Sequence, residues 1–178
     1  MTVAEAITKS GITPSASYTG IETADDFVFA IQTESAQSKE TDWVVCADHV
    51  KEHSGALNAT TNSDTFIRTG STDTKSAVQR TLSVNGNRCV GDAFQDFLLS
   101  RKIVFGTGSD VIVPYIYFSL RTGKGEKGSC TLVVTSDVGG AAGSPATFAC
   151  DVKSIGVPGT FDYLTATQSA AGGNAVKA

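Results

Sequence analysis

The chain has 178 residues, a length typical of one domain with a sizeable core. Its formal net charge is -4, and its Lys and Arg residues form no cluster of the kind that binds nucleic-acid phosphates. No apolar run reaches 18 residues, so no membrane partner is expected. No secretory signal is visible, and a mature form stripped of its signal would look the same. Residues 1–178 therefore predict a single globular domain.

The N-terminal part of the chain predicts an arm followed by two strands. Residues 1–24 are weakly patterned, with at most one helical turn at residues 4–9, and form the predicted arm. Residues 26–33 predict a strand because apolar side chains alternate there with a period of two. Residues 43–50, WVVCADHV, are apolar on both faces at their start and predict a second, sandwiched strand.

Residues 51–75 predict a long irregular loop, because Ser, Thr, Asn and Gly dominate the segment. A loop of this length in a compact domain is usually functional or disordered. Its few apolar residues cannot offset the entropy of ordering it, so we expect it to become ordered only against a neighbouring subunit. We identify Phe66, Ile67 and Arg68 as its candidate assembly residues.

The next segment predicts a strand at residues 77–84, a turn at Asn85-Gly86 and then one helix over residues 92–101. Asp92 and the residue three positions later have the spacing of a capping box. The helical face carries three large apolar side chains, which should pack on the sheet and which we also identify as candidate assembly residues: Phe94, Phe97 and Leu98.

The last third of the chain is β-patterned. Residues 111–121, VIVPYIYFSLR, predict a central strand, with Pro114 indicating a bulge or an edge. Glycine-rich residues 123–128 predict a hairpin tip, after which strands are expected at residues 130–136, 147–155 and 161–164. Residues 165–178 are small and polar and predict a frayed tail. Many short strands with one flanking helix predict an all-β sandwich or barrel.

No catalytic or metal-binding set stands out. His49 and His53 match the H-x-x-E-H spacing, but that motif requires a helix and this segment is β-patterned. We therefore expect no metal, no cofactor and no enzyme activity. The four widely spaced cysteines favour reduced core thiols, with one or two disulfides as the alternative.

The order of these parts resembles a known family. An arm and strands precede a long polar loop, the segment SVNGNRCVGDAFQDFLLS carries the helix, and VKSIGVPGTFDY lies near the end. Over residues 26–164 the chain resembles the major tail protein, or tail tube protein, of long non-contractile-tailed bacteriophages.

The resemblance implies a β-sandwich or barrel with a flanking helix and no catalytic residues. It implies six copies in a ring, with rings stacked around the tape-measure protein as a conduit that DNA crosses without specific binding. Tail terminator and tip proteins would be further partners. The protein would be assembled in the host cytoplasm and reside in the virion tail. The alternative is a binding module, a carbohydrate-binding or adhesin-like sandwich, and a small hydrolase is the third candidate.

Overall fold

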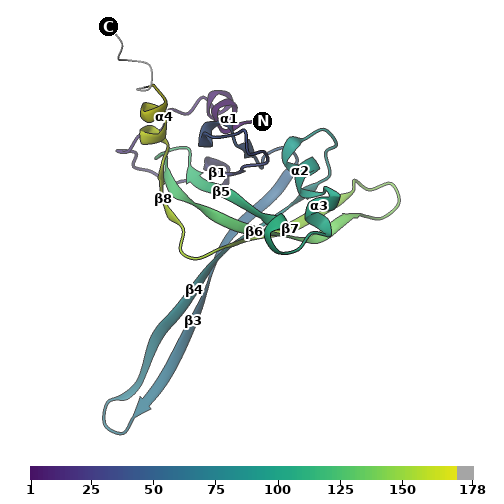
Figure 1. The fold of residues 1–178 in the computed structure, drawn as a ribbon. Helices are drawn as coiled ribbons and strands as arrows, with labels where there is room; N and C mark the ends of the chain where they lie inside the picture. The colour runs from purple at the N-terminus through teal and green to yellow at the C-terminus, as the bar shows by residue number, and fades with distance from the viewer. Residues whose placement is uncertain (172–178) are drawn as a thin grey trace.

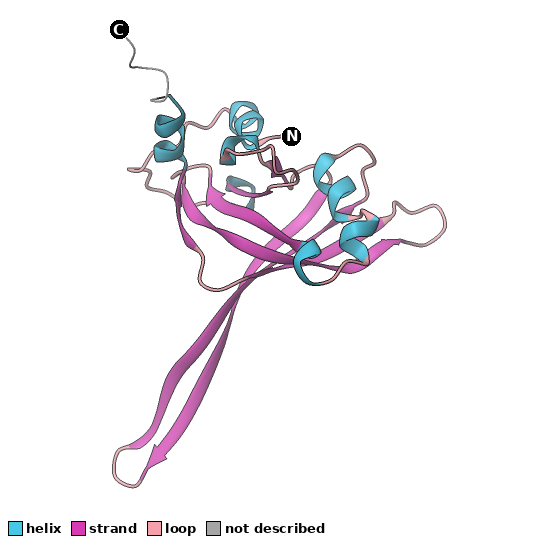
Figure 2. Cartoon of the chain, viewed as in Figure 1, coloured by secondary structure: helices cyan, strands magenta, loops and turns pink. Residues whose placement is uncertain are grey.

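The computed structural model describes residues 1–171, which form one antiparallel sheet of eight strands with helices on both faces. The strand order is β2-β1-β5-β6-β7-β4-β3, with β8 paired to β6, and the two end strands do not pair with each other (Figures 1 and 2). The sheet is therefore open, and the expected all-β fold with helices is confirmed, although the barrel is not closed.

The elements have the following bounds. The strands are β1 (Phe27–Ile31), β2 (Val44–Val45), β3 (Val50–Phe66), β4 (Gly70–Asn87), β5 (Ile112–Ser119), β6 (Lys124–Gly139), β7 (Thr147–Ser154) and β8 (Gly159–Asp162). The helices are α1 (Val3–Ser10), α2 (Ala93–Leu98), α3 (Arg101–Val104) and α4 (Tyr163–Ala171), with 3-10 turns at Ala24–Asp26, Glu40–Asp42 and Gly108–Val111. None of the helices in this described part of the chain is long and apolar enough to cross a membrane.

Two apolar clusters lie on the two faces of the sheet. The larger includes Phe29 and Tyr115 and is covered by α2 and α3, while the smaller includes Val28 and Phe118 and is covered by α1 and α4 (Figure 1). Because β1 and β5 alternate between the two clusters, both of their faces are buried. The predicted central strand is confirmed, and no bulge is found at Pro114, whose carbonyl accepts from the Gln32 amide just beyond β1.

The predicted helix is present, but it is divided. Asp92 accepts a hydrogen bond from the Gln95 amide at 2.9 Å, and α2 ends at Leu98 before the separate turn of α3. Phe94 and Leu98 are 0% exposed, and Phe94 meets Phe29 edge to face at 5.9 Å. Partly buried Phe97 packs against the same cluster, so the predicted packing of this face on the sheet is confirmed.

Residues 1–10 and 163–171 are more ordered than the sequence suggested. Residues 1–24 do not form a free arm, since Thr2 caps α1 and Val3 is 0% exposed in the smaller cluster. The frayed tail predicted from residue 165 is wrong as far as Ala171, because α4 occupies that stretch and Ala166 packs on the same cluster. Residues 172–178 lie outside the described residues. The chain thus has four α-helices in its described part, where one was predicted.

Two predicted turns are strands in the structure. Asn85 and Gly86 lie within β4 and pair with β7, where a Cβ on Gly86 would lie 2.5 Å from the His49 carbonyl oxygen. Residues 124–128 lie within β6, and a Cβ on Gly125 would lie 2.1 Å from the Tyr117 carbonyl oxygen. These glycines permit close contact between backbones, and the turn before β6 falls instead at residues 120–123.

The predicted irregular loop over residues 51–75 is also wrong. The segment is the distal part of a long antiparallel hairpin formed by β3 and β4, which projects from the body of the domain (Figures 1 and 2).

Candidate assembly surface

The β3–β4 hairpin is the most unusual surface of the molecule. β4 pairs with β7 only from Thr81 to Asn87, so beyond Thr81 the two hairpin strands pair only with each other. Every residue from 54 to 77 is exposed. At about 3.3 Å per residue, the free part extends roughly 40 Å from the sheet. We call residues 54–80 the ribbon and residues 66–70 its tip.

Polar β-branched residues and a suitable turn make this segment a hairpin. Threonines recur on both strands, and threonine favours extended backbone. Ile67 to Thr69 form the turn, and Gly70 supplies the positive φ of 78° that such three-residue loops require. The Asn58 side chain donates to Thr81 Oγ1 at 2.9 Å, and the Ser63 hydroxyl donates to Asp73 across the strands. The turn glycine between threonine-rich segments was the signal for a hairpin in the sequence.

Gln95 of α2 fixes the root of the hairpin. Its side-chain amide donates to the Asp48 carbonyl at 2.7 Å and to the Asn87 carbonyl at 3.2 Å, while its Oε1 accepts from the Cys89 amide at 2.7 Å. The side chain is 0% exposed. One buried residue therefore joins the helix to the chain segments on both sides of the hairpin.

A charged contact fixes the hairpin against the body. Arg80 of β4 donates to Glu126 Oε1 of β6 at 2.9 Å, and the Tyr115 hydroxyl donates to the same oxygen at 3.2 Å. The Arg80 guanidinium also lies 5.3 Å from the centre of the Tyr117 ring. Burial raises the pKa of Tyr115, and nearby Glu126 raises it further, so the hydroxyl remains protonated as a donor.

The ribbon presents apolar side chains with no partner in the subunit. Leu57 is 61% exposed and shares a face with Ala59 and Val78, the face that continues from buried Leu82. At the tip, Phe66 is 54% and Ile67 103% exposed. A two-stranded hairpin is marginally stable alone, and free strand edges and exposed apolar groups favour contacts with other chains.

The ribbon and the helix thus separate the six predicted assembly residues into two groups. Phe66, Ile67 and Arg68 are exposed together at the tip. Phe94 and Leu98 are buried in the subunit's own core, and Phe97 is largely covered. In this conformation these three side chains offer little or no surface to another subunit and can affect assembly mainly by stabilising the body of the domain. The sequence did not identify Gln95 or Arg80 as hairpin anchors, because Glu126 lies 46 residues from Arg80 and the partners of Gln95 are backbone groups.

The histidines and cysteines are the other side chains that the sequence offered for metal binding or chemistry. Within residues 1–171, no three His, Cys, Asp or Glu side chains are grouped so as to hold a metal ion. His49 has a φ of 57° in the turn before β3, and His53 packs edge to face on Tyr117 at 6.0 Å. All four cysteines are free thiols, and burial raises the pKa of Cys150 to about 12.

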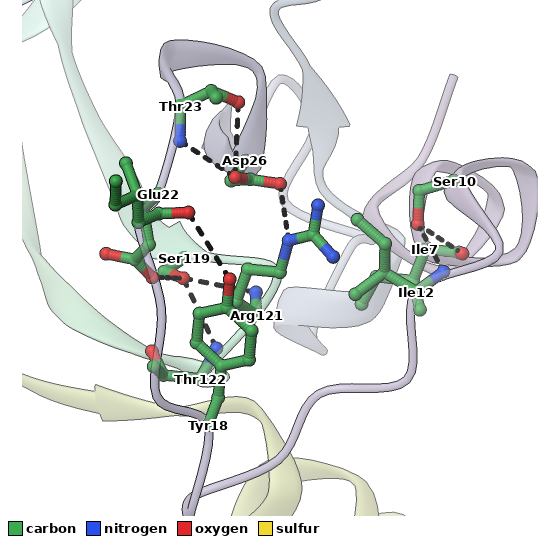
Figure 3. A network of polar contacts seen from close by, with 11 residues as sticks. Ile7, Ser10, Ile12, Tyr18, Glu22, Thr23, Asp26, Ser119, Arg121 and Thr122 are labelled. Carbon is green, nitrogen blue, oxygen red and sulfur yellow. Dashed lines mark hydrogen bonds and ion pairs between the residues drawn. The ribbon is translucent and has the colours of Figure 1, made fainter.

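Asp26 lies in a buried polar network just before β1 (Figure 3). Its carboxylate accepts from the Thr23 amide at 2.8 Å, from the Thr23 hydroxyl at 3.1 Å and from Arg121 Nε at 2.8 Å. The Thr23 amide and then the Arg121 guanidinium hold the pKa of Asp26 below its usual value. The neighbouring Ser119 hydroxyl donates to Glu22, so the segment before β1 is bound to the end of β5.

No protein-family model and no curated protein matches the chain. Its fold is similar to that of a chain in the tail of a gene transfer agent particle. That structure, the tail of an empty particle refined with C6 symmetry, matches with a TM-score of 0.55 and 16% identity over 78% of this chain and 98% of the other. A chain in the virion of the native particle matches equally, with a TM-score of 0.55 and 16% identity over 79% of this chain and 98% of the other.

At 16% sequence identity, this structural similarity establishes the fold alone. The resemblance implied a β-sandwich or barrel of the tail tube type with one flanking helix. Its mainly antiparallel sheet and its similarity to a tail chain are confirmed, whereas the sheet is not closed and more than one helix flanks it. The function of such a fold in this protein depends on its surfaces, and the ribbon is one that is exposed over residues 54–77.

Proposed function

We propose that the protein is a structural subunit of a virion tail, a tail tube protein that polymerises into stacked rings. The observation that carries this proposal is the ribbon, roughly 40 Å of exposed hairpin on a fold similar to that of a particle tail. Such a hairpin is costly to leave uncovered, whereas in an assembly its edges and apolar side chains are buried between subunits.

Six copies would form each ring. The number follows from the family resemblance and agrees with the C6 symmetry in the description of the similar tail. A closed ring buries the same surface of every copy, and contacts between rings extend the assembly in one direction. The tape-measure protein would occupy the bore during assembly, and terminator and tip proteins would bind the two ends.

The bore would conduct DNA without holding it. The chain has a net charge of -4 and no cluster of Lys and Arg, so it offers few phosphate contacts. Weak contacts suit ejection, because each phosphate contact would add to affinity and slow passage. The role is structural, with no catalytic step.

The carbohydrate-binding or adhesin-like alternative gains no support from the single tryptophan. Trp43, the only Trp in the sequence, is 8% exposed and its indole donates to the Gln37 carbonyl at 3.1 Å. It therefore offers no stacking platform for a sugar ring.

Size-exclusion chromatography followed by negative-stain electron microscopy tests the proposal. Purified protein at high concentration should form rings or tubes with six-fold symmetry in end-on views. A strict monomer at all concentrations would contradict the tail assignment, and a monomer that binds glycans would support the binding module instead.

A further inference from the structure

A cavity lies where the two ends of the open sheet approach each other. β2 and β3 end the strand order without pairing, yet residues of β1, β2, α1 and the β3 root line one cavity of about 430 Å³. Its apolar wall includes Phe27, Val28, Val45, Val50 and Leu120. Pockets of roughly 300–1,000 Å³ hold sizeable ligands. We call this the seam cavity.

We infer that the tip of one copy's ribbon docks in the seam cavity of the next copy. The inference rests on the proposed function, since it specifies the contact between stacked subunits. The tip offers two adjacent apolar side chains, Phe66 and Ile67, which are 54% and 103% exposed in the isolated subunit. The cavity offers an apolar wall of matching character.

Charges at the two surfaces are compatible. The lining of the seam cavity includes side chains of both charges. The basic residues are Lys9 and Lys51, and the acidic residues are Asp25, Asp48 and Glu52. Both signs also occur at and beside the tip, with Arg68 in the tip and Asp64 two residues before it. Each charge at the tip therefore has opposite charges available at the rim, whereas a uniformly acidic or basic rim would repel one of them.

The geometry requires a second copy. The cavity wall includes Val50 to His53 at the root, and the tip of the same hairpin is roughly 40 Å away along the strands. In Figure 1 the tip and the region of α1 lie at opposite ends of the molecule. A contact between opposite ends is heterologous, and such a contact extends an open stack when the rotation between copies does not close a ring.

Disulfide trapping tests the contact directly. Ile67→Cys combined with Ala47→Cys places one thiol at the tip and one at the exposed rim of the cavity. Oxidised assemblies of this variant should give a ladder of covalent multimers on a non-reducing gel. The matched control combines Ile67→Cys with Ala141→Cys, an exposed position in the β6–β7 loop away from the cavity, and should give no ladder. Equal ladders, or none in either variant, would overturn the inference.

Filling the cavity gives a second, independent test. Ala47→Trp should lower the yield of tubes by about tenfold or more, as expected for blocking an anchor at the centre of an interface. Because Ala47 is exposed, the melting temperature should not change, and Ala141→Trp should assemble normally. Normal assembly of Ala47→Trp would also overturn the inference.

The results separate the two proposals. Wild-type tubes without a specific ladder would remove the docking site and leave the tail assignment intact. A wild-type chain that never assembles would remove both.

Discussion

The two halves of β4 differ in how much the rest of the subunit stabilises them. From Thr81 to Asn87 it pairs on both sides, and Leu82 and Val84 are buried in the larger cluster. From Gly70 to Arg80 it pairs on one side only and is mostly exposed. The first half is stabilised by burial within the subunit, and the second lacks that stabilisation until another chain covers it.

We therefore expect folding and the proposed assembly to depend on different parts of this hairpin. Substitutions in the body should change the free energy of unfolding, whereas substitutions in the ribbon should change association and leave the fold intact. For Leu98 and Gln95 in the body, the matched changes lie in the ribbon, at Leu57 and Gln79.

The largest effect is expected at Leu98. Leu98→Asp would place a carboxylate among buried apolar side chains under α2 and should cost on the order of 4 kcal/mol or more. Because a domain of this kind is stable by only about 5–15 kcal/mol, the variant should be insoluble or largely unfolded. The matched change Leu57→Asp, on the exposed ribbon, should leave the thermal unfolding midpoint unchanged. A soluble Leu98→Asp protein with the wild-type midpoint would contradict the buried position of α2.

Gln95 should come next. Gln95→Leu leaves the Asp48 and Asn87 carbonyls and the Cys89 amide without their partner, at about 1–3 kcal/mol for each group that water cannot reach. Urea denaturation should show this loss. Gln79→Leu, the same change on the exposed ribbon, should cost close to nothing. Equal midpoints for the two variants would show that Gln95 does not hold the root of the hairpin.

Asp26 should give the stability of the body a dependence on acid pH. Its folded-state pKa is lowered by the Thr23 amide and Arg121, so its contribution is present above the unfolded pKa of about 3.9 and is lost as pH falls through the folded pKa. Asp26→Asn should therefore be less stable than wild type at pH 7, with the difference shrinking in acid. Asp25→Asn, at the exposed neighbouring carboxylate, should show no such trend. Thermal melts at several pH values measure both, and parallel curves for all three proteins would contradict the role of the network.

Elements of the body could be predicted from the sequence where burial imposes a regular spacing of apolar residues. Alternating apolar residues marked β1 and β7, and the stripe of Phe94, Phe97 and Leu98 marked the helix and its packing. In those elements the apolar residues recur with the period of the strand or helix because at least one face is buried, so a single sequence is enough to predict the element.

The errors have specific physical causes. Asn85-Gly86 was interpreted as a turn, but Gly86 is needed for the close approach of the His49 backbone within a continuous strand. The ribbon was interpreted as a loop because neither face is buried, which removes the alternation that normally indicates a strand. Its hairpin is specified by threonines and a turn glycine instead. The candidate site could thus be located by composition, but its shape could not.

The smallest expected effect on stability, and the sharpest test of the comparison, is shortening of the ribbon. Leu57 and Arg80 are directly opposite in the ladder, so residues 58–79 can be replaced by an Asn-Gly turn without changing the register of the root. The removed residues are almost all exposed and contribute little burial, and the Arg80–Glu126 contact is retained. The unfolding midpoint should therefore stay close to that of wild type, while rings and tubes should disappear from negative-stain images. Hydrogen exchange on wild type provides the complementary measurement: ribbon amides should exchange quickly in monomers, because a two-stranded hairpin opens readily, and slowly in tubes. Long tubes formed by the shortened protein, or ribbon amides equally protected in monomer and tube, would show that the two halves of β4 do not divide folding from assembly.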